Sequence, residues 1–234
     1  MGVFNLKKIR IDRVALVLIV LFLFVSAFLV YNNYHTKNGD DNKNNIDNSF
    51  KLDDSNTKNF SKVFVDGKVF SYEDIKREYD ILPFVLRQQM SFDDYVNKFF
   101  IPRTLLLVDA EKNNIVVSDD EVNASLEELK NALLQQNSSL EEYLDSNNLS
   151  LDEFLSRIKE DLLVQKDIDF VTKDINVSDD ELKAVYDAFN LSSKNLTFEQ
   201  SKNDLYNFVL NDKKNKFLQT YISKLEKKFN VKFE

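Results

Sequence analysis

The hexapeptides VSDDEV (117–122) and VSDDEL (177–182) decide the fold class, because each has the form of a helix start. A Ser at the first position of a helix binds a free backbone N–H, and a Glu three residues later reaches back to the Ser backbone, which is the capping-box arrangement. The same spacing recurs in three further pairs, Ser138/Glu141, Ser150/Glu153 and Thr197/Gln200. These repeated helix starts predict a mostly α-helical protein.

The three adjacent acids in each hexapeptide could also indicate a divalent-metal site or a carboxylate cluster. Consecutive residues of a helix point about 100° apart, so three neighbouring carboxylates do not converge on one ion. Acids in the first turn are instead favoured by the positive end of the helix dipole. We therefore interpret Asp119, Asp120 and Glu121, and the equivalent acids of the second copy, as capping residues, and expect no metal and no catalytic residue.

The regions around these motifs predict a small sheet and two long helices. VFVDGKVF (63–70) has two β-prone runs around Asp-Gly, as in a hairpin, and VKF (231–233) alternates like a strand. Apolar residues at steps of three and four predict helices over 151–175 and 198–229. Pro102 should kink or break the helix that contains it. We expect the sheet to join the two ends of a multi-helix body.

Composition excludes most enzyme classes. The 234-residue chain has no Cys, one His (His35) and three Gly, so thiolate catalysis, Ser–His–Asp triads, Cys or multi-His metal sites and nucleotide-binding loops are not expected. Residues 36–62 balance five lysines against five acids and residues 1–13 carry +3, so the chain charge of −8 leaves −11 for residues 63–234. Such an acidic body argues against nucleic-acid binding.

The N-terminal quarter predicts a membrane anchor and a spacer. Residues 14–34 contain no charged side chain and are long enough to span a bilayer. The basic residues 1–13 before them predict a cytoplasmic N-terminus and an extracytoplasmic body, in the periplasm or at the cell surface. A signal peptide cut after Ala27 is the alternative. Residues 35–61 are rich in Asn, Asp and Lys and predict a flexible linker, and residues 62–234 form the body.

Asn-x-Ser/Thr sequons also occur along the chain, seven in all. In an exported protein they could accept glycans. The competing interpretation is that an Asn ends one helix and the Ser or Thr two residues later starts the next.

The order of these parts resembles a known family. Five segments follow one another as in the chaperone module of SurA/PrsA-type exported foldases: VFVDGKVFSYEDIKREY, FIPRTLLLVDAEKNNIVVSDDEV, the paired helices from SSLEEYL to DIDFV, INVSDDELKAVYDAF and TFEQSKNDLYNFVLNDKKNKFLQTYISKLEKKFNVKF. That module is more distantly similar to the substrate-binding part of trigger factor. The resemblance covers about residues 62–234. In relatives a parvulin prolyl isomerase domain commonly follows the segment that resembles VSDDELKAVYDAF. Here only Asn190–Leu196 stands at that place, too short to hold such a domain.

The resemblance implies a membrane-anchored holdase that binds unfolded or nascent exported polypeptides through apolar surfaces, without nucleotide and without isomerase activity. The alternative is a scaffold or accessory subunit that binds one envelope or translocation partner. The groove residues expected to contact clients are Tyr95, Phe99, Leu106, Phe154 and Phe170.

Overall fold

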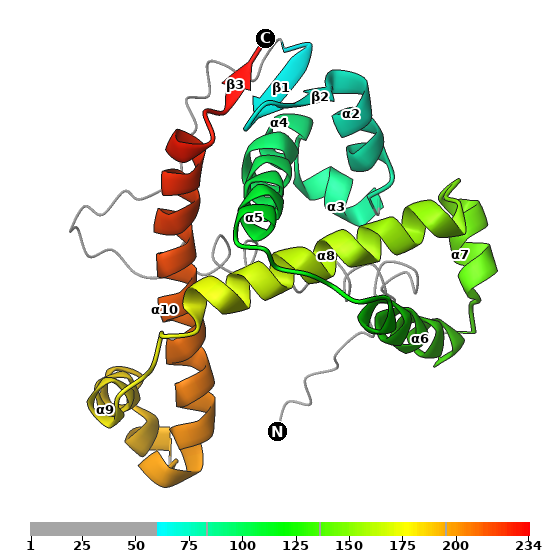
Figure 1. Ribbon diagram of the computed structural model, residues 1–234. Helices are drawn as coiled ribbons and strands as arrows, with labels where there is room; N and C mark the ends of the chain where they lie inside the picture. Colours follow the sequence, from blue (N-terminus) through cyan, green and yellow to red (C-terminus); the bar gives the residue numbers. More distant parts are fainter. Residues whose placement is uncertain (1–59, 83, 136, 195) are drawn as a thin grey trace.

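The computed structural model describes residues 60–234, apart from residues 83, 136 and 195 (Figure 1). The expected basic tail, membrane anchor and nearly all of the linker (1–59) lie outside the described residues. Within the described part, none of the helices combines the length and apolar character needed to cross a bilayer.

A three-stranded sheet closes the body, as the sequence predicts. β1 (Lys62–Val65) and β2 (Lys68–Ser71) form an antiparallel hairpin whose turn residues Asp66 and Gly67 both have positive φ, 49° and 79°. A two-residue hairpin turn of type I′ requires this backbone, which explains the Asp-Gly pair. β3 (Lys232–Phe233) lies antiparallel to β1 on its other edge, in the order β2-β1-β3. The two ends of the body are therefore joined.

A central lobe packs beneath this sheet (Figure 1). Its helices are α2 (Tyr72–Asp80), α3 (Phe84–Gln89), α4 (Phe92–Tyr95), the π-helix η1 (Val96–Phe100) and α5 (Ile101–Lys112). Val63 and Val65 of the sheet are fully buried against Ile101 and Leu105 and their neighbours. The same core includes Val164 from α8 (Leu151–Thr172) and Ile222 from α10 (Phe198–Lys228).

Pro102 does not break the helical path, so the predicted break is wrong, but the helix does change its geometry next to the proline. The chain runs through α4, η1 and α5 without a loop, and Pro102 lies in the first turn of α5. The N–H of Ile101 binds the carbonyl of Val96, five residues earlier, instead of one four residues earlier. Proline crowds the carbonyl four residues before it, and the wider π turn gives the ring room.

A second lobe surrounds the N-terminal half of α8. α6 (Asp119–Gln135) and α7 (Leu140–Ser146) pack against that half around a separate core that contains Leu129, Leu133, Tyr143 and Phe154. Figure 1 shows α8 crossing the molecule from this lobe to α10. α8 therefore connects the second lobe to the central lobe.

A third group of elements forms an arm that projects from the body (Figure 1). We define the arm as α9 (Asp179–Ala188), the short 3₁₀ helix η2 (Leu191–Lys194) and the part of α10 that precedes Lys213. Leu205 and Val209 of α10 face Leu182 of α9 in a core of their own, whereas Ile222 and Leu225 face the central lobe. At 100° per residue these two pairs lie on different sides of α10, so one helix serves two cores.

The helix ends follow the capping chemistry expected from the sequence, with one shift. The capping pairs Ser150/Glu153, Ser178/Glu181 and Thr197/Gln200 are present, and Ser118 and Glu121 make the same reciprocal bonds. The predicted pair Ser138/Glu141 is wrong by one position, because Ser139 and Glu142 form the box. Both registers fit SSLEE, and the observed one buries Leu140 and Tyr143 on the side of the second core.

Five helices end at an Asn with a left-handed backbone. Each Asn stands two residues after the last helical residue and has a φ between 50° and 57°, at Asn114, Asn137, Asn148, Asn190 and Asn230. Asn tolerates this conformation better than other residues with a β-carbon. Three of these, Asn137, Asn148 and Asn190, are sequon residues, so their helix-ending role is confirmed.

Candidate functional site

Each VSDDE motif binds a lysine from another helix. Lys166 of α8 lies 2.6 Å from Glu121 Oε1 and donates to the carbonyl of Val116 at 2.8 Å. Lys213 of α10 repeats this pattern in the second copy. It lies 2.7 Å from Glu181 Oε1 and donates to the carbonyl of Asn176 at 2.6 Å. In both copies the lysine holds the capping Glu and the carbonyl five residues before it.

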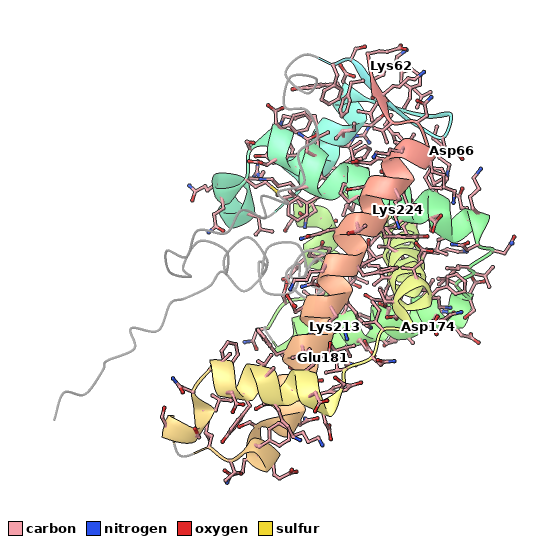
Figure 2. All side chains as sticks on the ribbon, turned by 90° about the vertical axis from the view of Figure 1, so that its left-hand side faces the viewer. Lys62, Asp66, Asp174, Glu181, Lys213 and Lys224 are labelled. Carbon is pink, nitrogen blue, oxygen red and sulfur yellow. The ribbon has the colours of Figure 1, made fainter. Side chains whose placement is uncertain are left out.

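The electrostatics of the two motifs match this geometry. The hydrogen bond from Lys166, followed by those from Ser118, lowers the pKa of Glu121 to about 2. The bond from Lys213, followed by those from Ser178, lowers the pKa of Glu181 to about 2 as well. Figure 2 shows Lys213 and Glu181 side by side where the arm meets the body. Each motif is thus a helix start that binds a lysine, and its capping Glu stabilises the contact between two helices.

The structure places the five expected client-binding residues in different environments. Tyr95, Phe99 and Leu106 lie in the central core and Phe154 in the second core. Phe170, near the end of α8, is 46% exposed and is the only one of the five outside the two cores, with the Lys173 ammonium 4.7 Å from the centre of its ring. Client contact by these residues stays a prediction, and in this conformation only Phe170 is available for it.

The arm carries exposed apolar side chains that the sequence did not single out. Phe189 and Phe208 are 46% and 40% exposed, and their rings meet edge-on with centroids 5.4 Å apart. Leu196 and Tyr206 of the arm are also exposed. Their signal in the sequence is weak, because an exposed Phe and a core Phe occupy similar positions in a helical pattern.

An open hollow of about 480 Å³ lies on the flank of the arm that holds Tyr206. Its apolar wall consists of Val177, Leu182 and Tyr206, and its polar rim includes Asp179 and Lys202, which form an ion pair at 3.0 Å.

Internal contacts make the arm a unit. The small core of Leu182, Leu205 and Val209 holds α9 against α10. Tyr186 donates a hydrogen bond to the carbonyl of Leu196 at 2.6 Å, which fastens the end of η2. The arm is continuous with the body through α10 and through the connection after α8, and Lys213 of α10 binds Glu181 at this boundary, so the orientation of the arm depends on the packing of those helices.

A cluster of charged residues in the central lobe holds α8 against α5. Arg103 of α5 donates to Glu160 and Asp161 of α8, with both Nη2 distances at 2.9 Å. Tyr95 of α4 donates to Glu78 of α2 at 3.1 Å. Burial raises the pKa of Glu78, while the charge of Arg103 acts in the opposite direction. Every group here has a partner of opposite charge or a hydrogen bond, which is typical of a structural cluster.

Comparison with known proteins gives one family. Residues 6–167 match the family model described as the SurA-like N-terminal domain, which is more than half of the chain. Neither the curated proteins nor the solved structures contain a significant match. The matched range ends within α8, so α9 and α10 extend beyond it. The mostly helical body with its small sheet agrees with this assignment, and the chain belongs to the family of SurA-like N-terminal domains.

Proposed function

We propose that the protein is a membrane-anchored, extracytoplasmic holdase that binds unfolded or nascent exported polypeptides through apolar side chains on its arm. Family membership indicates a chaperone-type function with polypeptide clients in general, and such domains are typically extracytoplasmic. The observation that carries the finer proposal is the exposure of Phe189 and Phe208 on a projecting arm. Burial of apolar client segments against such rings provides a driving force that needs no nucleotide.

The proposed anchor is the apolar segment 14–34, with the basic residues 1–13 on the cytoplasmic side. The body would then stand at the outer face of the membrane, where exported chains emerge unfolded. Its acidic charge would keep a complex with an apolar client in solution.

We further propose that the protein has no prolyl isomerase activity. In place of an inserted domain, Leu191–Lys194 forms η2 directly between α9 and α10. An isomerisation assay with a proline-containing peptide tests this point, and catalysis by the purified chain would contradict it.

The main test is suppression of aggregation. The full chain in lipid nanodiscs should protect a chemically unfolded client, and empty nanodiscs should not. Phe189→Ser combined with Phe208→Ser should reduce protection several-fold. Leu134→Ser is the matched control, because Leu134 is 66% exposed on α6, away from the arm. Equal protection by both variants would remove the arm from the proposal, and no protection by the unaltered chain would refute the holdase.

Crosslinking distinguishes a holdase from a scaffold. A photoreactive residue at position 208 in the native membrane should capture many different exported chains. A single dominant folded partner would instead support an accessory subunit with the same fold.

A further inference from the structure

Two buried carboxylates meet where α5, α8 and α10 pack together. Asp109 of α5 is 1% exposed and Asp167 of α8 is 0% exposed. One side-chain amide links them: Asn113 Nδ2 donates to Asp109 Oδ2 at 3.0 Å and to Asp167 Oδ1 at 3.4 Å. Buried carboxylates are rare unless each is matched by a cation or by several donors.

The donors at this junction are distributed unequally. Asp109 receives hydrogen bonds from Asn113, from the Tyr221 hydroxyl and, at 3.2 Å, from Lys228 Nζ, the last two being on α10. Asp167 receives only the long bond from Asn113, and its Oδ2 has no hydrogen-bond partner within the described residues. The arrangement therefore suits a charged Asp109 next to a neutral Asp167.

Among residues 60–234, apart from the three undescribed positions, few charged groups lie around Asp167. On α5 the negative charge of Asp109 faces it, and on α10 Lys228 and the Tyr221 hydroxyl do. On its own helix, Lys166 turns away to α6, where it binds Glu121. Burial, followed by the repulsion from Asp109, raises the pKa of Asp167 to about 7, against the weaker opposing effects of Asn113 and Lys228.

We propose that Asp109 and Asp167 form a proton-operated joint: a proton on Asp167 keeps α10 packed against α5 and α8, and loss of that proton loosens α10 and moves the arm. Without the proton, two buried negative charges face the half-exposed Lys228, and separation of the helices lets more water reach them. Because α10 carries the arm beyond this junction, its movement changes how the arm lies against the body (Figure 1).

The body has no histidine to perform this task. The only His of the chain is His35, which precedes residues 60–234. A transition near neutral pH in the body must then arise from carboxyl groups with raised pKa values. Burial also raises the pKa values of Glu78 and Asp161, which belong to the Arg103 cluster, and it raises the pKa of Glu226 of α10 to about 7. Glu226 makes a natural comparison, because the groups that act on Asp167 do not include it.

The joint deepens the proposed function, and only its effect on clients rests on that function. With the body outside the membrane, the pH of the surroundings would set the position of the arm and so the surface open to clients. The movement itself can be measured without any client.

The test is a distance measurement on the full chain in nanodiscs. Because the chain has no Cys, Lys62→Cys at the sheet and Ser192→Cys on the arm can each take one spin label. His35→Gln in the same background removes the only histidine. We expect the distance distribution to shift between pH 5.5 and pH 8.5, with a midpoint near the pKa of about 7 of Asp167.

Three variants make the result specific. Asp167→Asn should abolish the shift and keep the low-pH distribution, whereas Asp169→Asn, an exposed neighbour on α8, should retain it. Asp109→Asn should move the midpoint to lower pH, because it removes the repelling charge, and provides a second route if Asp167→Asn does not fold. Loss of the shift in Glu226→Gln but not in Asp167→Asn would overturn the joint.

Client protection is measured on the same samples at both pH values. A distance shift that Asp167→Asn abolishes, together with no protection at any pH, would support the joint and refute the holdase. Protection together with a pH-independent distance would refute the joint and leave the holdase standing.

Discussion

Replacement of Asp167 by Asn should make the free energy of unfolding less dependent on pH. The folded protein raises the pKa of Asp167 from 3.8 to about 7, mainly through burial and then through Asp109. When a carboxyl binds its proton more tightly in the folded state than in the unfolded state, the folded protein loses stability as the pH rises from the unfolded pKa to the folded pKa. One pKa unit corresponds to about 1.36 kcal/mol, so between pH 5 and pH 8 the unaltered protein should lose roughly 2.5 kcal/mol that the variant keeps.

Comparing the change in the free energy of unfolding caused by Asp167→Asn at pH 5 and at pH 8 cancels those effects of the substitution that do not depend on pH. An Asn amide left without a partner costs about 1–3 kcal/mol, but that cost is the same at pH 5 and at pH 8. Urea unfolding of the full chain, followed by circular dichroism at both values, gives the free energies. Asp169→Asn, the exposed control, should show no such difference. If the change caused by Asp167→Asn differs between the two pH values by less than about 0.5 kcal/mol, the assignment of a neutral buried Asp167 is refuted.

Three further substitutions test the packing and the helix starts. Leu225→Ala, at 2% exposure in the central core, should lower the free energy of unfolding by about 2–5 kcal/mol in urea titrations. Lys213→Met should lower the urea midpoint at pH 7 and have less effect at pH 2, since the low pKa of Glu181, about 2, keeps its carboxylate charged until the pH falls through that value. Ser139→Ala should cost about 1 kcal/mol and Ser138→Ala much less, and the reverse order would contradict the observed cap register.

Local chemistry explains why much of the fold could be predicted. Asp66-Gly67 requires the positive φ values that the hairpin turn adopts, and a Ser or Thr followed by a Glu or Gln three residues later marks most helix starts. These signals depend on residues close in sequence. The π turn before Pro102 could not be predicted in this way, because it depends on how the surrounding core holds a helix that proline would otherwise interrupt.

The functional surface was harder to predict because apolar residues look alike in a sequence. Tyr95 and Phe154 lie in cores, whereas Phe189 and Phe208 do not, and nothing in their local spacing separates the two groups. The buried acids did leave a signal. Asp109 stands four residues after Leu105, in the phase of the core-facing positions of its helix, where a charged residue is unexpected. That pattern could have identified the junction before its partners on α8 and α10 were known.

The pairing of β3 with β1 has a consequence for how the protein is made. Phe64 of β1 pairs with Lys232 of β3, about 170 positions further along the chain. β1 therefore cannot pair with β3 until nearly all of the body has been synthesised. Until then α10 cannot complete the core that Val63 and Ile101 share with Ile222. A body exported segment by segment would thus pass through a stage in which its own apolar surface is uncovered, and would itself require the kind of protection that it is proposed to give.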